Sequence, residues 1–441
     1  MPMFRSVLVA NRGEIALRVL RTLREMGIRG VVALSSLDLP VPPPLADKVI
    51  CLGGAEPERS YMDAHRLLSA AVACGADAVH PGYGFLSEDP RFSSLCREMG
   101  LAFIGPSPET LGLLCDKEVA CRLAGQLGIP NLLLGRVDGE SPARFTARIP
   151  EYPVIIKPVK GGGGKGIRIA REEKEFERRL NEAKKETPAR YSEDGFYVER
   201  FLPQARHLEV QVMRDAGGRT TAFPPRDCSL QHRNQKWMEE TPASKCPAHL
   251  KACLSRDACR LVEAAELVGI ATVEFLVAED GYFFLEVNPR IQVEHTVTEM
   301  IAAVDLVREQ LRLSAGEPLK EPPPPRGHAV EARLYVLPRG ESLRFLLPGG
   351  PGIRVDAAPQ NPGALLRYDP LLAKICAWAP DRASALARLS RALEETVVEE
   401  ASSNLFHLQR LVDSEPFRHG EYYTHTLEDL IGGDPWITCA G

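Results

Sequence analysis

Four consecutive glycines interrupt the stretch VIIKPVKGGGGKGIRIA, which covers residues 154–170. Glycine inside a strand or helix costs about 0.5–1 kcal/mol relative to alanine, so this block predicts a loop. The flanking runs at 154–156 and 167–170 are rich in β-branched residues, so we expect the loop to join one strand to another. This argues against a P-loop, which needs Gly-Lys-Ser/Thr at the start of a helix, because Lys165 is followed by Gly166.

Two roles are open to such a loop. Its backbone N–H groups are not covered by side chains and can close over phosphates, while Lys157, Lys160 and Lys165 neutralise the negative charge. The alternative is an ordinary surface loop with incidental lysines. The choice between them depends on the polar residues elsewhere in the chain.

Composition restricts the class of protein. The 441 residues are enough for about three domains. A net charge of −5 gives no electrostatic reason to bind nucleic acid or an anionic membrane, and no apolar run reaches the roughly 18 residues of a membrane span. Arg12 and Glu14 come too early for a signal peptide, and eleven cysteines without a CxxC motif are typical of reduced thiols. We expect a cytoplasmic enzyme with no nucleic-acid or membrane partner.

The order of strand-like and helix-like segments predicts a multidomain α/β protein of mixed α+β character. Strand and helix alternate up to about residue 112, which predicts a Rossmann-like parallel α/β domain over 1–112. Residues 113–320 hold the glycine loop, a charged helix in REEKEFERRLNEAKKE and several strands. The proline-rich stretch EPPPPRGH, residues 321–328, is the clearest linker, and a smaller domain is expected over 326–441.

The densest group of polar residues is TVEFLVAEDGYFFLEVNPRIQVEH, residues 272–295, where two β-rich runs flank Glu279-Asp280-Gly281. This pattern predicts a hairpin. With a two-residue turn at Asp280-Gly281, Glu274 and Glu286 would lie on opposite faces. With a three-residue loop and Gly281 in the left-handed conformation, the two glutamates would lie directly opposite each other.

We expect the second register, because it makes chemical use of both carboxylates. Two carboxylates opposed on one buried face repel each other unless a cation lies between them. Hard oxygen ligands beside a phosphate-binding loop suit magnesium, and Asn288 continues the same face. The alternative is a solvent-exposed polar face of an edge strand.

Arg290, Gln292 and Glu294 follow the hairpin at a spacing of two residues. An extended chain would direct all three side chains to one side. A cation, an amide and a carboxylate next to a metal could bind a small oxyanion and remove its proton. A carboxylate held by Arg290 would have a low pKa, so we expect Glu294 to be ionised, and we expect His295 to form a structural hydrogen bond.

Eight motifs resemble, in order and spacing, those of the biotin carboxylase family of ATP-grasp ligases. They are ANRGEIALR, HPGYGFLSE, FIGP, VIIK…GGGGKG, DCSLQ…NQK…EE.PA, EVNPRIQVEHTVTEM, VDLVREQLR and GHAVEAR. The likeness extends over nearly the whole chain. It implies that residues 113–320 form an ATP-grasp domain with a glycine-rich lid at about 131–203, and that 326–441 form the C-terminal biotin carboxylase domain.

The resemblance also implies roles for individual residues. It assigns ATP binding to Lys117, Lys157, Gly161, Gly162, Gly163, Gly164, Gly166, Glu199, Leu202, His207, Gln231, Asn234 and Leu276. The implied ligands of magnesium, or manganese, are Glu274, Glu286 and Asn288. The implied bicarbonate site consists of Lys236, Arg290, Gln292 and the backbone of Val293, with Glu294 as the general base. Arg333 would stabilise the enolate form of the ureido ring of biotin.

The reaction of the family uses ATP to convert bicarbonate into carboxyphosphate, from which N1 of biotin takes the carboxyl group. The biotin acceptor of the family is a lysine between two methionines, and no Met-Lys-Met occurs here. We therefore expect a separate biotin carboxyl carrier protein, a separate carboxyltransferase subunit and a homodimer of this chain, as part of an acetyl-CoA or acyl-CoA carboxylase of fatty acid biosynthesis. The choice of acyl-CoA or keto acid would belong to the carboxyltransferase.

The sequence also departs from the family pattern. Lys160 stands where the glycine run usually begins, and Asn234 replaces a common histidine. After Arg333, LYVLPRG lacks the usual acidic Ala-Glu-Asp-Pro, and NPGALLRYDP replaces a more aromatic segment. The last two changes concern the biotin side and the dimer surface more than ATP binding.

Two alternative functions follow from these patterns. One is another ATP-grasp ligase that joins a carboxylate to an amine, which RIQVE and Arg333 disfavour. The other is a non-catalytic nucleotide-binding homologue, which the complete set of charged residues disfavours.

Overall fold

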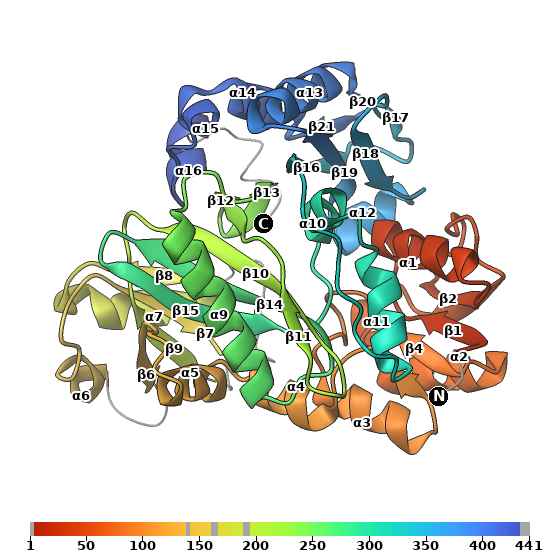
Figure 1. Ribbon diagram of the computed structural model, residues 1–441, viewed down its shortest axis with the longest axis horizontal. Helices are drawn as coiled ribbons and strands as arrows, with labels where there is room; N and C mark the ends of the chain where they lie inside the picture. The colour runs from red at the N-terminus through yellow and green to blue at the C-terminus, as the bar shows by residue number, and fades with distance from the viewer. Residues whose placement is uncertain (1–3, 138–141, 160–165, 188–194, 433–441) are drawn as a thin grey trace.

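The computed structural model describes residues 4–137, 142–159, 166–187 and 195–432 (Figure 1). Lys160, Lys165 and the glycines Gly161, Gly162, Gly163 and Gly164 lie outside the described residues, so their predicted contact with phosphates stays a prediction. Within the described ranges, none of the helices is long and apolar enough to cross a membrane.

The N-terminal part is a five-stranded parallel sheet in the order β3-β2-β1-β4-β5. Its strands are β1 (Ser6–Val9), β2 (Arg29–Ser35), β3 (Lys48–Gly53), β4 (Ala78–His80) and β5 (Ala102–Phe103). The helical segments are α1 (Gly13–Glu25), η1 (Pro57–Arg59), α2 (Ala64–Cys74), α3 (Pro90–Glu98) and α4 (Pro108–Leu114). β1 is buried along its whole length, as a central parallel strand requires, and the predicted parallel α/β domain is confirmed.

A small antiparallel sheet follows, in the order β6-β9-β7-β8. Its strands are β6 (Leu133–Val137), β7 (Val154–Pro158), β8 (Arg168–Ala170) and β9 (Phe196–Arg200), and its helices are α6 (Pro142–Thr146) and α7 (Glu173–Glu186). β7 pairs with β8 from Val154 opposite Ala170 to Ile156 opposite Arg168, which confirms that the glycine stretch joins two strands. The charged helix α7 buries Phe176, Leu180 and Ala183 and leaves most of its charged side chains outside.

Ten strands form the large sheet, with the main order β15-β14-β10-β12-β13-β16-β19-β18. Their bounds are β10 (Arg206–Arg214), β11 (Thr220–Ala222), β12 (Arg226–His232), β13 (Gln235–Thr241), β14 (Gly269–Ala278), β15 (Gly281–Asn288), β16 (His328–Pro338), β18 (Ile353–Ala357), β19 (Leu371–Ala379) and β21 (Ala401–Ser403). β13 pairs with β16 across the proline-rich linker, for example at Met238 opposite Ala332. The sheet therefore continues without a break from the central part of the chain into the C-terminal part.

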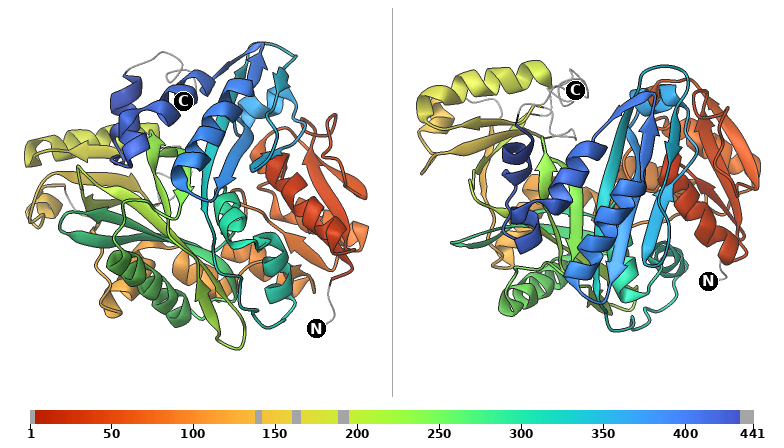
Figure 2. Two further views of the ribbon diagram at one scale, coloured as in Figure 1. Left: turned by 45° about the horizontal axis from the view of Figure 1, so that its top comes forward. Right: turned by 90° about the horizontal axis from the view of Figure 1, so that it is seen from above.

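The remaining elements cover this sheet and its ends. A short ribbon pairs β17 (Arg344–Leu346) with β20 (Val397–Glu399). The helices are α5 (Lys117–Gln126), α9 (Ala248–Ala264), α10 (His295–Ala302), α11 (Leu306–Ser314), α12 (Pro362–Arg367), α13 (Arg382–Glu395), α14 (Leu405–Asp413), α15 (Glu415–His419) and α16 (Thr426–Ile431). The small sheet with α7 and the N-terminal sheet lie at opposite ends of the molecule (Figures 1 and 2).

The β14–β15 hairpin brings Glu274 directly opposite Glu286, as predicted, but by a different route. Ala278 pairs with Gly281, so the turn has two residues, Glu279 and Asp280, and the predicted three-residue loop is wrong. Gly281 does have a positive φ of 136°. The register shifts by one residue between Glu274 and Phe275, where Leu285 forms a bulge. Because a bulge adds one residue to one strand, it restores the alignment that the short turn would have prevented.

Candidate active site

Glu199 on β9 holds two lysines at one end of the site. Its two carboxylate oxygens lie 2.7 Å from Nζ of Lys117, at the start of α5, and 2.7 Å from Nζ of Lys157 on β7. Burial alone would raise the pKa of Glu199, but the two ammonium groups outweigh burial and lower that pKa to about 2. The structure thus brings together three residues that were predicted to bind ATP, and both lysines pair with the same buried carboxylate.

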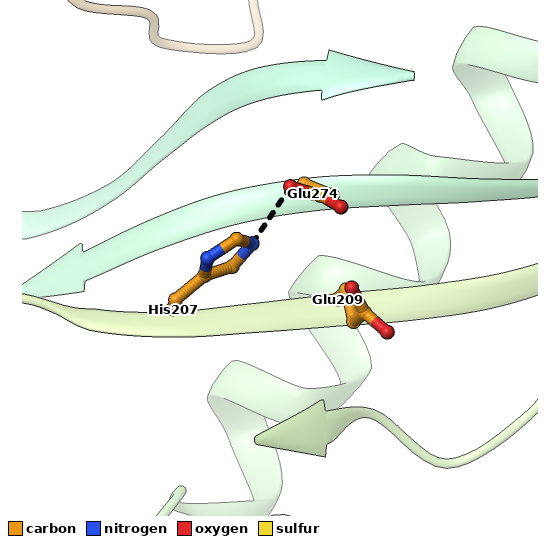
Figure 3. Close-up of side chains that lie close together, drawn as sticks. All are labelled: His207, Glu209 and Glu274. Atoms are coloured by element: carbon orange, nitrogen blue, oxygen red, sulfur yellow. Dashed lines mark ion pairs between the residues drawn. The ribbon is translucent and has the colours of Figure 1, made fainter. Parts of the chain in front are cut away.

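Glu274 on β14 is the centre of the next group. One of its oxygens, Oε1, accepts hydrogen bonds from the amides of Asn288 at 3.0 Å and Gln292 at 2.9 Å and from Lys236 Nζ at 3.1 Å. The other lies 2.8 Å from Nε2 of His207, which points toward it from the neighbouring strand β10 (Figure 3). Burial would raise the pKa of Glu274, but Lys236 and His207 hold it well below its usual range.

Lys236 on β13 links three buried carboxylates. Its Nζ lies 2.7 Å from Glu209, 3.1 Å from Glu274 and 2.6 Å from Glu294, and it donates to Gln292 Oε1 at 3.3 Å. Burial alone would lower the pKa of this ammonium, but the three carboxylates outweigh burial and raise it well above its usual value. Lys236 is therefore a permanent positive charge beside Glu294.

Glu294 itself is the last residue before α10, with 1% of its surface exposed. Its Oε1 lies 2.6 Å from Lys236, and its Oε2 accepts from Nη2 of Arg333 on β16 at 3.1 Å. These two cations outweigh burial and keep the pKa of Glu294 well below its usual range. The expected ionised state is correct, but the expected partner, Arg290, is wrong.

The side chain of Arg290 forms hydrogen bonds with residues other than Glu294. Its Nε donates to Glu88 at 2.7 Å and its Nη2 donates to Asn288 Oδ1 at 2.9 Å. β15 ends at Asn288 and the chain then turns into α10, so residues 290, 292 and 294 do not form the extended, alternating segment that the sequence predicted. Gln292 and Glu294 still meet at Lys236, while Arg290 hydrogen-bonds to Glu88 and interacts with Glu294 through charge alone.

Arg333 faces three buried carboxylates. Besides Glu294, its Nη2 pairs with Glu239 on β13, and its Nε lies 3.9 Å from Glu331. Burial is the main cause that raises the pKa of Glu239 to about 8, with Glu331 and Glu294 adding repulsion and Arg333 opposing it. Arg333 therefore contacts carboxyl groups whose pKa values are shifted in opposite directions, with that of Glu294 lowered and those of Glu239 and Glu331 raised.

The other predicted residues are placed as follows. Leu276 pairs across the ladder with His207, and Gln231 Nε2 lies 2.6 Å from His207 Nδ1. Leu202 is partly exposed just after β9, and Asn234 is exposed in the tight turn between β12 and β13 at a φ of 62°. Gly166 has a φ of 76°, where a Cβ would collide with Thr187 Oγ1.

The backbone carbonyl of Val293 accepts from Lys374, and His295 forms the expected structural hydrogen bond, to the carbonyl of Gln292.

Three segments of the chain match known families. Residues 3–111 match "Biotin carboxylase, N-terminal domain", residues 116–322 match "Carbamoyl-phosphate synthase L chain, ATP binding domain", and residues 335–429 match "Biotin carboxylase C-terminal domain". The chloroplastic biotin carboxylase of Arabidopsis thaliana is 39% identical over 434 residues, which cover 95% of this chain and 81% of that protein. This chain belongs to the biotin carboxylase family.

Solved structures of the family have the same fold. The biotin carboxylase of Campylobacter jejuni in complex with β-γ-ATP has a TM-score of 0.90 and 32% identity, covering 97% of this chain and 99% of that one. The biotin carboxylase domain dimer of 2-oxoglutarate carboxylase from Hydrogenobacter thermophilus, with MgADP and bicarbonate, has a TM-score of 0.90 and 34% identity, covering 97% and 98%.

A magnesium ion, as this family implies, fits the residues present. Glu274 and Glu286 place two carboxylates opposite each other, and Asn288 donates to Glu274 at 3.0 Å and to Glu286 at 3.5 Å. Burial raises the pKa of Glu286, and the charge of Glu274 raises it further. A divalent cation would relieve this repulsion, and hard carboxylate oxygens are its preferred ligands.

Three residues of the site, Glu209, Glu88 and Glu239, were not predicted from the sequence. Glu209 lies on β10 two residues after His207, and one ligand atom from each of these residues and from Glu274 lies within 4.8 Å of the others (Figure 3). If RHLEVQV is a strand, His207 and Glu209 are two residues apart, so their side chains point to the same face of the sheet. Glu88 in HPGYGFLSE had no such signal, because its partner Arg290 is 202 residues away.

Proposed function

We propose that this protein is an ATP-dependent ligase that carboxylates biotin with bicarbonate. The observation that carries the proposal is the position of Glu294, a buried and ionised carboxylate held by Lys236 on one oxygen and Arg333 on the other. A base needs an ionised carboxylate within reach of its substrate, and an anion needs cations beside that base. Both requirements meet at this residue.

The phosphate side of the reaction would use the lysines now paired with Glu199. ATP phosphates compete with that carboxylate for Lys117 and Lys157, and the two ammonium groups neutralise the charge on the triphosphate. Positioning and charge neutralisation supply most of the catalysis in phosphoryl transfer. Magnesium, held by Glu274, Glu286 and Asn288, would neutralise phosphate charge further when bound.

Bicarbonate would bind between Lys236, Arg290, Gln292 and the backbone of Val293. Glu294 accepts the bicarbonate proton, and the freed bicarbonate oxygen attacks the γ-phosphorus of ATP. The bond between that phosphorus and the β–γ bridging oxygen breaks, which gives carboxyphosphate and ADP. Lys236, already 2.6 Å from Glu294, keeps a positive charge beside the anion throughout.

Biotin would react on the side of Arg333. The N1 atom of biotin forms a bond to the carboxyl carbon of carboxyphosphate, the bond from that carbon to the phosphate oxygen breaks, and the leaving inorganic phosphate takes the N1 proton. Negative charge develops on the ureido oxygen during this step, and the guanidinium of Arg333 stabilises it. Arg333 can contact both biotin and Glu294, because its planar guanidinium has several N–H donors and one of them, on Nη2, already reaches Glu294.

We further propose that the biotin is carried by a separate biotin carboxyl carrier protein, and that a separate carboxyltransferase subunit takes the carboxyl group onward. The chain would act in the cytoplasm as a homodimer, within an acetyl-CoA or acyl-CoA carboxylase. Co-expression with an active biotin ligase tests the first part. The purified chain should give no signal with labelled streptavidin, and a covalent biotin signal on this polypeptide would contradict the proposal.

The division into domains at 1–112, 113–320 and 326–441, with a lid at about 131–203, is part of the same proposal. The small sheet β6-β9-β7-β8 supports the lid, because it lies within that range and is separate from the large sheet.

Hydrolysis of ATP with and without bicarbonate tests the proposed activity. The account predicts hydrolysis that requires bicarbonate and rises when free biotin is added. Hydrolysis that does not depend on bicarbonate, or that needs an amine acceptor, would contradict the proposed activity.

A further inference from the structure

The backbone carbonyls of Asn288, Ile291 and Gln292, between the end of β15 and α10, accept hydrogen bonds from residues nearby in the chain. Arg290 donates its backbone N–H to the carbonyl of Asn288 at 2.9 Å and its Nη1 to the carbonyl of Ile291 at 3.1 Å. His295 lies 2.7 Å from the carbonyl of Gln292. The carbonyl of Val293 is different, because its partner is Lys374, 81 residues later on β19, with a distance of 3.0 Å.

Lys374 is an unusual donor for this task. Its side chain is fully buried, and burying an ammonium group is costly unless it is paired. The pairing comes from Glu14 at 3.1 Å and Asp356 at 3.8 Å. Burial alone would lower the pKa of Lys374, but these carboxylates outweigh it and raise that pKa, so the group remains charged.

Three parts of the molecule meet at this ammonium. Glu14 lies in the first turn of α1, Asp356 lies on β18, and Val293 belongs to the segment that leads into Glu294. Glu14 also accepts from the hydroxyl of Tyr83. The cation therefore joins the N-terminal sheet domain and the C-terminal strands to the backbone beside the proposed base.

We propose that Lys374, held in place by Glu14, is a positioning residue that fixes the Val293–Glu294 peptide for bicarbonate binding and proton transfer. This rests on the proposed function. The peptide group is planar, so fixing the carbonyl oxygen of Val293 also fixes the direction of the N–H of Glu294 and the point from which its side chain starts. A displacement of about 1 Å at such a place can cost about 10²-fold in rate.

The test separates positioning from a merely structural role. Lys374→Met keeps the length of the side chain and removes the ammonium, but it leaves Glu14 with one partner fewer. The double variant Glu14→Gln with Lys374→Met removes both charges of the pair and so avoids that unpaired carboxylate. A matched control is Arg18→Met, because Arg18 is another buried cation, on the same helix α1, that pairs with Glu299 and Asp305.

Each variant is measured as the full chain for its Tm and for bicarbonate-dependent ATP hydrolysis. We expect Lys374→Met to raise the KM for bicarbonate about 10-fold or more and to lower kcat about 10- to 100-fold, with the KM for ATP changed less than about twofold. The double variant should recover Tm but not the KM for bicarbonate. Arg18→Met should lower Tm and leave the KM for bicarbonate near that of the parent chain.

Two results would overturn the proposal. One is recovery of the KM for bicarbonate together with Tm in the double variant, which would make the ion pair structural. The other is failure of both Lys374 variants to fold, which would also make the residue structural. Absence of bicarbonate-dependent hydrolysis in the parent chain would instead reject the proposed function, so the two failures are distinguishable.

Discussion

Glu274 and Glu286 lie directly opposite each other on β14 and β15, and the repulsion between them contributes to the raised pKa of Glu286. Lys236 offsets the charge of Glu274, but without a metal ion the repulsion between Glu274 and Glu286 remains unfavourable for the fold. The repulsion between the two carboxylates lowers the stability of the fold, as expected for a site whose carboxylates serve to bind a metal ion.

Glu286→Gln should therefore have opposite effects on stability and on activity. In the absence of magnesium we expect it to stabilise the fold by up to about 1 kcal/mol, the scale of a cross-strand pair. We expect ATP hydrolysis to fall about 10-fold or more and to need more magnesium. Thermal unfolding with and without magnesium measures the first effect, and a magnesium titration measures the second.

The matched control for this variant is Glu279→Gln, which removes one carboxylate from the exposed turn of the same hairpin. It should change neither quantity. Loss of stability in Glu286→Gln without magnesium would show that the two carboxylates do not repel.

Glu294→Gln keeps the shape of the side chain and removes the proton acceptor. We expect kcat for bicarbonate-dependent ATP hydrolysis to fall about 10²–10⁴-fold, the range of general base catalysis, with little change in the KM for ATP. Steady-state kinetics on the full chain gives both values. Turnover close to that of the parent chain would assign the base to another residue.

Arg333→Ala should separate the two halves of the reaction. The guanidinium is placed to stabilise charge on biotin, so we expect carboxylation of biotin to fall much more than bicarbonate-dependent ATP hydrolysis. Hydrolysis should still fall somewhat, because Arg333 also holds Oε2 of Glu294. Equal losses in the two assays would contradict the assignment of Arg333 to biotin.

Stability should depend on pH through Glu239. Its folded-state pKa is about 8, raised from an ordinary value of 4.5, chiefly by burial. Between these two pH values the folded protein holds a proton that the unfolded chain has lost, so stability falls as pH rises through this window. Glu239→Gln, which stays neutral, should escape this loss.

The measurement is the difference in Tm between Glu239→Gln and the parent chain at several pH values. As the pH rises from 5 to 8, the free energy of unfolding of the variant should increase relative to that of the parent chain by about 1–3 kcal/mol. Glu399→Gln, at an exposed position on β20, is the control. A difference that stays constant with pH would contradict the raised pKa.

The hairpin illustrates how far alternation in a sequence can predict a site. It correctly placed Glu286 and Asn288 on one face, because a period of two follows from strand geometry. The register that adds Glu274 to that face was chosen by the chemical argument that a cation lies between the two carboxylates. Alternation could not predict the bulge at Leu285, since Phe283, Phe284 and Leu285 are all apolar and give no alternation from which the extra residue could be read. The correct pairing was therefore predicted together with the wrong turn.

Arg290 illustrates a second limit. A spacing of two residues has meaning only while the chain stays extended, and β15 ends at Asn288, directly before Pro289. The actual partner, Glu88, comes from the N-terminal part of the chain. Contacts of this kind depend on how the domains pack, and no local pattern contains that information.

Lys236 illustrates a third limit. Its carboxylate partners are Glu209 on β10, Glu274 on β14 and Glu294 before α10. The order of strands in the sheet brings them together, and strand order cannot be read from periodicity. Motif resemblance supplied Lys236 as a site residue, whereas the structure supplied the reason for its permanent charge.

Transfer of labelled carbon from bicarbonate to biotin tests the central claim most directly. The full chain is incubated with ATP, magnesium, free biotin and carbon-labelled bicarbonate, and the label in carboxybiotin is compared with the ADP formed. The account predicts label in carboxybiotin that requires ATP and disappears in Glu294→Gln. Hydrolysis of ATP with no label on biotin, or labelling that does not need ATP, would contradict it.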